Sequence, residues 1–185
     1  MGGDPSNAAV WSGADVYIGG DTATIPVAGA AFDNTWDLVG LLNGDDGFSE
    51  DMSLDKSDFY AWGGILVATT RRNFKLTRTF TAYEDNKTVF DLWYPGHDVT
   101  FDVDGTYEGD ILVPDLQAKF KIAFETNSGG VIKRVVSKNY AQVDERGTNK
   151  EGENDIASRA FTVAIYPDSG GGLFYTYRGP AATGP

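Results

Sequence analysis

The chain has 185 residues, 41% of them hydrophobic, and a formal net charge of −12 at pH 7, so it is long and apolar enough to bury a core. It has no cysteine and a single histidine, His97, which excludes disulfides, thiolate sites and any catalytic pair or metal site built from several histidines of one chain. No apolar run approaches the ~20 residues of a membrane span, and the start, MGGDPSNAAVW, lacks the basic and apolar stretches of a secretion signal.

The first third of the chain reads as strands and turns. Strands are predicted at residues 10–19 and 36–42, separated by a Gly-, Ala- and Thr-rich loop over residues 20–34. The turn signal NGDDG at residues 43–47 leads to an alternating run at residues 48–58. Neither face of that run is strongly apolar, so we expect it to be unusually exposed for a strand.

The middle of the chain predicts a long hairpin followed by one helix. After Gly63-Gly64, a β-branched run at residues 65–70 and an alternating run at residues 74–83 form the second half of the hairpin. A helix is predicted over residues 84–94, with Asp85 or Asn86 as its cap and Pro95-Gly96 as its stop. Its apolar face consists of Val89, Phe90 and Trp93.

The second half of the chain returns to strands. They are predicted at residues 99–103, 116–124, 131–143, 160–166 and 173–177, with a charged loop at residues 146–155. The alternation places these side chains inward: Leu116, Ala118, Phe120, Ile122, Phe124, Phe161, Val163 and Ile165. Together the elements predict a mainly β protein, an antiparallel β-sandwich or barrel with one flanking α-helix, long loops and terminal arms. We expect one domain over residues 1–185, with an N-terminal arm at residues 1–10 and a C-terminal tail at residues 178–185.

The sequence contains no convincing motif for metal binding or catalysis. The run DVDG at residues 102–105 resembles the start of a calcium loop, but the twelfth position is Val113 instead of the required acid, which favours an ordinary turn. Adjacent carboxylates such as those of Glu50 and Asp51 point to opposite sides of a strand and do not face each other as in a glycosidase. No nucleophile–base pair can be built, so we expect no enzymatic activity, no cofactor and no metal.

Charge is distributed unevenly. Ten acidic residues and no basic one precede Lys56, which is typical of a solvated acidic face or of a surface that lets nucleic acid pass without sticking. The dense basic cluster, Arg71-Arg72 with Lys75 and Arg78, could bind nucleic acid, but pairing with the acidic first third, within or between subunits, is the favoured interpretation. Of the four tryptophans, Trp62 beside Gly63-Gly64 is the best candidate for an exposed interface anchor.

Four groups of residues resemble the major tail (tail tube) proteins of long-tailed siphophages, especially those of actinobacterial phages. They span residues 37–177, and their order and spacing carry the resemblance more than any single motif. They are VG at 39–40 with DG at 46–47 and SED at 49–51; AWGG at 61–64 with VATTR at 67–71; TFTAYEDN at 79–86; and KRVV at 133–136 with FTV at 161–163 and YPD at 166–168.

The resemblance implies a structural virion protein that forms hexameric rings, which stack into the hollow tube through which phage DNA is delivered. It implies partners of four kinds: other copies of the chain, a tail tip or initiator, a tape-measure protein and a tail terminator. DNA would pass without specific binding, past an acidic lumen, and no membrane insertion is expected. The protein would be assembled in the host cytoplasm and reside in the phage tail. No immunoglobulin-like decoration domain is expected after the last strand.

Within this family we expect contacts between rings and subunits at the hairpin end, the basic pair and the charged loop. The interface residues are Asp55, Lys56, Asp58, Phe59, Tyr60, Trp62, Arg71, Arg72, Arg146 and Lys150. The candidates for an acidic lumen are Glu50, Asp51, Asp55 and Asp58.

Two alternatives stay open on the sequence. One is a monomeric β-sandwich that binds carbohydrate through exposed Trp and Tyr side chains. The other is the tube subunit of a contractile tail or secretion system, which shares the fold and would require a sheath partner.

Overall fold

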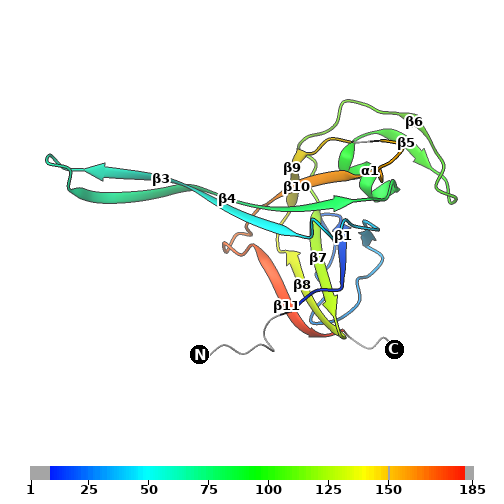
Figure 1. The fold of residues 1–185 in the computed structure, drawn as a ribbon, viewed down its shortest axis with the longest axis horizontal. Coiled ribbons are helices and arrows are strands. Elements are labelled where there is room, and N and C mark those ends of the chain that lie inside the picture. Colours follow the sequence, from blue (N-terminus) through cyan, green and yellow to red (C-terminus); the bar gives the residue numbers. More distant parts are fainter. Residues whose placement is uncertain (1–8, 150, 182–185) are drawn as a thin grey trace.

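The structure is a computed structural model that describes residues 9–149 and 151–181. The backbone consists almost wholly of antiparallel strands, with one helix beside them (Figure 1). The elements are β1 Gly13–Gly19, β2 Trp36–Leu38, β3 Ser49–Tyr60, β4 Leu66–Ala82, α1 Lys87–Trp93, β5 Asp98–Phe101, β6 Tyr107–Asp110, β7 Lys121–Ser128, β8 Val131–Ser137, β9 Ala141–Arg146, β10 Arg159–Ile165 and β11 Phe174–Pro180.

Two sheets form the body. One has five strands in the order β11-β8-β7-β1-β2, and the other has four in the order β3-β4-β10-β9. A core cluster joins them: Val16 and Phe124 from the first sheet share it with Phe80, Phe161 and other residues of the second. The rings of Phe80 and Phe161 stack at 5.1 Å between centroids. The predicted antiparallel β-sandwich with one flanking helix is confirmed.

The far face of the five-stranded sheet is covered by the predicted loop. Ala123 and Val136 of that sheet form a second cluster with Ala23 and Trp36, and Phe32 packs against it. The indole Nε1 of Trp36 donates to the carbonyl of Thr24 at 2.9 Å, which ties the loop down. The middle of the five-stranded sheet is therefore covered on both faces.

The helix covers one end of the sandwich. Asn86 is its N-cap, as predicted, and its side-chain oxygen accepts from the backbone N–H of Val89 at 3.0 Å. Val89, Phe90 and Trp93 are buried, which confirms the predicted apolar face. The helix has only seven residues, so packing of this face holds it in place.

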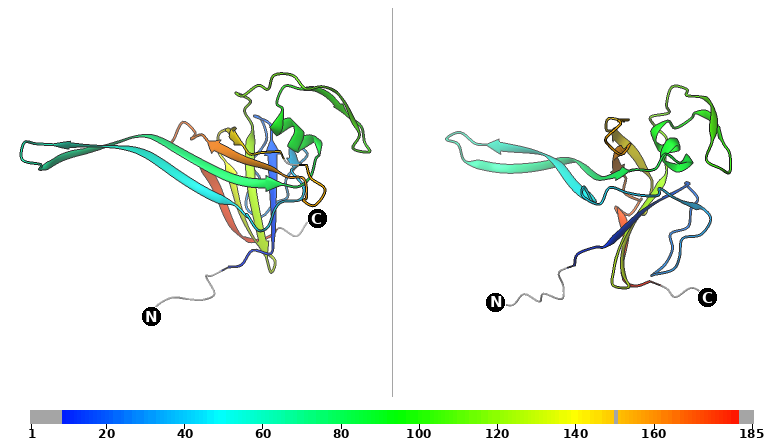
Figure 2. Two further views of the ribbon diagram at one scale, coloured as in Figure 1. Left: turned by 45° about the horizontal axis from the view of Figure 1, so that its top comes forward. Right: turned by 45° about the vertical axis from the view of Figure 1, so that its right-hand side comes forward.

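Two hairpins leave the body in opposite directions. The β3–β4 ribbon projects far to one side, and the β5–β6 hairpin with the segment after it projects on the other side, beyond the helix (Figures 1 and 2). We call residues 54–74 the projecting hairpin and residues 98–116 the flap. Each ribbon pairs only with itself in its outer part.

Several predicted strand boundaries are wrong. The strand at residues 36–42 ends at Leu38, because Gly40 adopts φ +96° and leaves only an isolated bridge at Leu42. The runs at 65–70 and 74–83 are one continuous strand, β4. The segment 131–143 is two strands, β8 and β9, and the second strand of the flap, β6, was not predicted.

The chain around residue 116 also differs from the prediction. β7 begins only at Lys121, and the Leu116 side chain, expected inward, is 63% exposed. Phe120, Ile122 and Phe124 are buried as predicted. At the chain ends, β11 continues to Pro180, into the predicted C-terminal tail, whereas residues 1–8 and 182–185 lie outside the described residues.

Candidate assembly interface

The projecting hairpin exposes both of its faces. Within β3 every residue except Asp58 is exposed, and β4 is exposed from Leu66 to Lys75 apart from Thr70. The inner part of β4 is different, because it pairs with β10 from Leu76 to Ala82 and enters the core there. The C-terminal part of β4 is therefore packed in the body, whereas its N-terminal part is exposed to solvent.

A β-bulge separates these two parts. Ser53 pairs with Lys75, but Asp55 pairs with Arg72, so Asn73 and Phe74 both oppose Leu54. Asn73 takes the left-handed φ of +56° that such a bulge requires and that asparagine tolerates. Its side-chain amide donates to the Asp55 carboxylate at 2.7 Å, which fixes the bend.

The middle of the projecting hairpin is charged. Lys56 and Asp58 form an ion pair at 3.1 Å, and the Thr69 hydroxyl donates to Asp58 at 2.6 Å. These two hydrogen bonds lower the pKa of Asp58. Arg71 and Arg72 are exposed, and neither forms a hydrogen bond or ion pair with another described residue.

The tip of the projecting hairpin is apolar. From residue 59 to residue 68 the sequence FYAWGGILVA carries no charge. Trp62 is fully exposed, and Tyr60 is 62% exposed. The other exposed apolar side chains of the tip are Phe59, Ile65, Leu66 and Val67. An uncharged tip of this kind is typical of a surface that another protein covers.

The predicted interface residues are therefore only partly brought together. Residues 55–62 and the pair Arg71-Arg72 lie on the projecting hairpin, as the sequence suggested. Arg146 lies elsewhere: it ends β9, donates through Nη2 to the Leu92 carbonyl at 3.0 Å, and burial lowers its pKa. Lys150 lies outside the described residues.

The basic cluster predicted from the sequence is divided by the sheet. Lys75 pairs with Asp144 of β9 at 2.8 Å on the outer face of the four-stranded sheet. Arg78 turns to the core face, where its guanidinium lies 4.4 Å from the centroid of Phe124 and its Nε lies 3.5 Å from Glu50. Only Arg71 and Arg72 remain available to a partner.

The four acidic lumen candidates lie on two faces. Asp51 pairs with Thr77 on the outer, hydroxyl-rich face of the sheet, where Ser49 and Thr79 also meet at 2.6 Å between oxygens. Asp55 is on the same side of β3 by alternation. Glu50 points to the core face with Arg78, and Asp58 lies on that side of the ribbon with Lys56.

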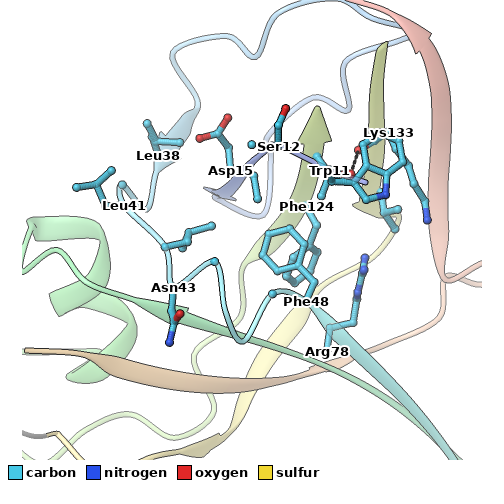
Figure 3. A pocket seen from close by; sticks show the side chains of 18 of the residues that line it. Trp11, Ser12, Asp15, Leu38, Leu41, Asn43, Phe48, Arg78, Phe124 and Lys133 are labelled. Carbon is cyan, nitrogen blue, oxygen red and sulfur yellow. Dashed lines mark hydrogen bonds between the residues drawn. The ribbon is translucent and has the colours of Figure 1, made fainter. Parts of the chain in front are cut away.

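A cavity of about 590 Å³ opens beside Arg78 (Figure 3). Its wall includes Trp11, Phe48 and Phe124, and the Arg78 side chain runs past Phe48 toward Trp11 and Lys133. Burial raises the pKa of Asp15 at the same cavity. The Nε and Nη1 atoms of Arg78 are buried without a hydrogen-bond acceptor among the described residues. The lining has no histidine.

The single histidine has a structural role. Its Nδ1 accepts from the Val99 backbone N–H at 3.0 Å, so Nε2 carries the proton and donates to Asp91 at 2.7 Å. The ring also packs edge-on against Phe90 at 4.8 Å. His97 thus joins the helix to the flap. Within residues 9–149 and 151–181, no group of three or more His, Asp or Glu side chains is arranged to hold a metal ion.

No family model matches the chain, and no curated protein matches it either. Among solved structures it is similar to chains of two injection particles. A chain from the extended sheath–tube complex of an extracellular contractile injection system, PVC, is 11% identical, with a TM-score of 0.46, over 90% of this chain and 88% of that one. A sheath/tube terminator of that system is 12% identical, with a TM-score of 0.48, over 91% and 96%.

The tube-terminating cap of the anti-feeding prophage AFP is 11% identical, with a TM-score of 0.45, over 95% of this chain and 98% of that one. These neighbours are components of tube, terminator and cap assemblies. No helix within the described part of the chain has the length and apolarity needed to span a bilayer.

Proposed function

We propose that this chain is a structural subunit that self-assembles into stacked hexameric rings, forming the hollow tail tube through which phage DNA is delivered. The observation that supports it is the projecting hairpin, with both faces and the tip exposed. A two-stranded ribbon alone in water is marginally stable at best. Burial against further copies of the chain would stabilise it. The ring size and the role in a siphophage tail follow from the resemblance of the sequence.

The open edges of the four-stranded sheet are consistent with a ring. β3 lies at one edge and β9 at the other, so copies placed side by side can continue the sheet from one subunit to the next. A closed ring leaves no unpaired edge, whereas an open sheet invites uncontrolled pairing.

We assign the lumen to the outer face of this sheet. That face carries hydroxyl, small and acidic side chains, among them Ser49, Asp51, Thr77 and Thr79. Asp51 and Asp55 become the acidic lumen residues, while Glu50 and Asp58 point to the other side. Together with the net charge of −12, such a wall would repel phosphate and let DNA pass without specific binding.

The tip of the projecting hairpin would contact the adjacent ring, with Trp62 as its anchor. Further ring-to-ring contacts would come from the loop at residues 146–155 and from both termini. Tube growth would involve a tail tip or initiator, a tape-measure protein and a terminator, and the assembled chain would reside in the phage tail after assembly in the host cytoplasm.

Electron microscopy of the purified chain, concentrated at moderate salt and negatively stained, tests this proposal. We expect six-fold rings or hollow tubes from the natural chain. Trp62→Ala should abolish tubes while circular dichroism stays unchanged, because the side chain has no neighbours to lose. Val27→Ala, at an exposed apolar position off the projecting hairpin, is the matched control and should form normal tubes.

The outcomes separate the alternatives. Normal tubes from Trp62→Ala would remove that side chain from the interface. A natural chain that stays monomeric even with isolated tail tips as nuclei, and that binds glycans on an array, would overturn the proposal in favour of a carbohydrate-binding module.

A further inference from the structure

The flap carries an unbalanced negative charge. Residues 98–116 contain six carboxylates and no lysine or arginine. None of the six forms an ion pair with another described residue; where they accept hydrogen bonds, the donors are Thr106 and the backbone of Thr106 and Gln117. The six residues are Asp98, Asp102, Asp104, Glu108, Asp110 and Asp115, all exposed.

Like charges even face each other across the flap. Asp98 is the register partner of Asp110, and Glu108 lies on the same side of the ribbon, opposite Thr100. Directly opposed like charges destabilise a strand pair. The other side of this ribbon holds Phe101 and Tyr107, which pack on Phe90 of the helix at 5.4 and 5.3 Å between ring centroids. The three carboxylates therefore point away from the body.

Exposed apolar side chains continue the acidic face. Directly after β6, the run Ile111-Leu112-Val113 is exposed, with Val113 at 93%, and Leu116 follows at 63%. At the turn of the flap Val103 is fully exposed. The flap thus combines an uncompensated negative face with an uncovered apolar strip.

The projecting hairpin has the complementary composition. It offers Arg71 and Arg72, two cations without an acceptor, directly beside an uncharged apolar tip. It extends about 20 Å beyond its bulge, from the rise of ~3.3 Å per strand residue. The two surfaces lie on opposite sides of the body, so the projecting hairpin cannot reach the flap of its own chain (Figures 1 and 2).

We infer that the flap is the acceptor for the projecting hairpin of a second copy of this chain. Arg71 of one copy, on the same side of the ribbon as its register partner Lys56, would lie against Asp98, Glu108 and Asp110 of the next, while the apolar tip covers the strip at residues 111–116. Because donor and acceptor are different surfaces, the contact is head-to-tail and propagates through a ring or a tube instead of ending at a dimer. The inference rests on the proposed function in that it requires self-assembly.

A charge swap tests the contact. Variant one carries Arg71→Glu and Arg72→Glu, and variant two carries Glu108→Lys and Asp110→Lys; all four positions are exposed and without ion pairs. Each variant alone should need at least about tenfold more protein to assemble, because like charges then meet at the contact. An equal mixture of the two should assemble as the natural chain does, since each hairpin finds an opposite flap. A single chain carrying all four changes should also assemble.

A matched control places the same positive charges elsewhere. Asp21→Lys with Asp37→Lys changes two exposed carboxylates on the body, outside the flap. Combined with variant one, it should fail to restore assembly. Restoration by this control, or failure of the mixture, would overturn the inference while leaving the assembly of the natural chain, and with it the proposed function, untouched.

Zero-length cross-linking gives an independent measurement that does not need rings or tubes. In a mixture of ¹⁴N- and ¹⁵N-labelled natural chains, a carbodiimide should join Lys56 of one copy to a flap carboxylate of the other, and mass spectrometry identifies the mixed-isotope peptide. The link should disappear in variant one and weaken as ionic strength rises. Links from Lys56 to other parts of a second chain, with none to residues 98–115, would exclude the flap as acceptor.

Discussion

Arginines in two regions of the molecule show how differently the chain uses the same side chain. In the body, Arg134 is 3% exposed, binds Glu125 at 2.7 and 2.6 Å through Nε and Nη2, and donates through Nη1 to the Ala30 carbonyl at 2.6 Å. In the projecting hairpin, Arg71 and Arg72 have no such partners. The charge of Arg134 is satisfied within the body, whereas the charges of Arg71 and Arg72 are left for another molecule to satisfy.

The largest effect on stability is expected from removing the buried arginine, Arg134. Arg134→Ala should lower the free energy of unfolding by about 3–5 kcal/mol, because it leaves the Glu125 carboxylate uncompensated in a buried site. Arg72→Ala should change it by less than about 0.5 kcal/mol. Urea denaturation followed by tryptophan fluorescence measures both. Equal losses in the two variants would show that the projecting hairpin is folded against the body in solution.

A smaller effect is expected at two asparagines. Asn86 caps the helix and also donates to the Val39 carbonyl at 2.8 Å, so Asn86→Ala should cost about 1–2 kcal/mol of unfolding free energy. Asn73→Gly at the bulge should be nearly neutral, because glycine also adopts a positive φ and the lost bond to Asp55 is exposed. The same denaturation measurement applies. A larger loss at Asn73 would mean that the bulge stabilises more than the hairpin.

The raised pKa of Asp15 predicts that the stability of the body depends on pH. Burial raises its pKa in the folded chain above the usual 3.8, so folding favours the protonated form, and stability falls as pH rises from the unfolded-state pKa through the higher folded-state value. At pH 7 the full penalty is present, and Asp15→Asn should raise the melting temperature. Well below pH 3.8 both side chains are neutral and the difference should vanish. A constant gain at all pH values would assign the effect to something other than this ionisation.

Only a small effect on stability is expected from deleting the whole projecting hairpin. Joining Ser53 to Lys75 through an Asn-Gly turn removes the projecting hairpin and keeps the register pairs of the inner ribbon. The free energy of unfolding should stay within about 1 kcal/mol of the natural chain, since the removed segment buries little, while assembly should be lost. Rings or tubes from the shortened chain would show that the hairpin is dispensable for the contact.

The sequence predicted the body well where alternation coincides with burial. Phe161, Val163 and Ile165 in β10 and the cap at Asn86 follow from local rules that the tertiary structure does not override. The same rules failed at Leu116, since a run of alternating residues does not reveal that the sheet begins only at Lys121. They also failed at Gly40, whose turn depends on Glu84, more than forty residues away, accepting from the Leu41 N–H.

The candidate interface was predictable in part for a related reason. Weak apolar filling in residues 48–58 signalled exposure, and Trp62 beside two glycines signalled a tip, both of which are local properties. The separation of Arg78 from Arg71 and Arg72 was not predictable, because a bulge at Asn73 shifts the alternation between them. The flap was not recognised as a surface, because its second strand is four residues long and contains a glycine, Gly109.

The continuity of β4 has a mechanical consequence. The strand that carries the outer ribbon is the same strand that pairs with β10 over the seven positions from Leu76 to Ala82. A pull on the tip along the strand axis is therefore carried in shear by all of those ladder bonds at once, instead of peeling them one by one. A tube built from such subunits would resist tension through the sheets themselves, and it would stretch or bend first at the bulges.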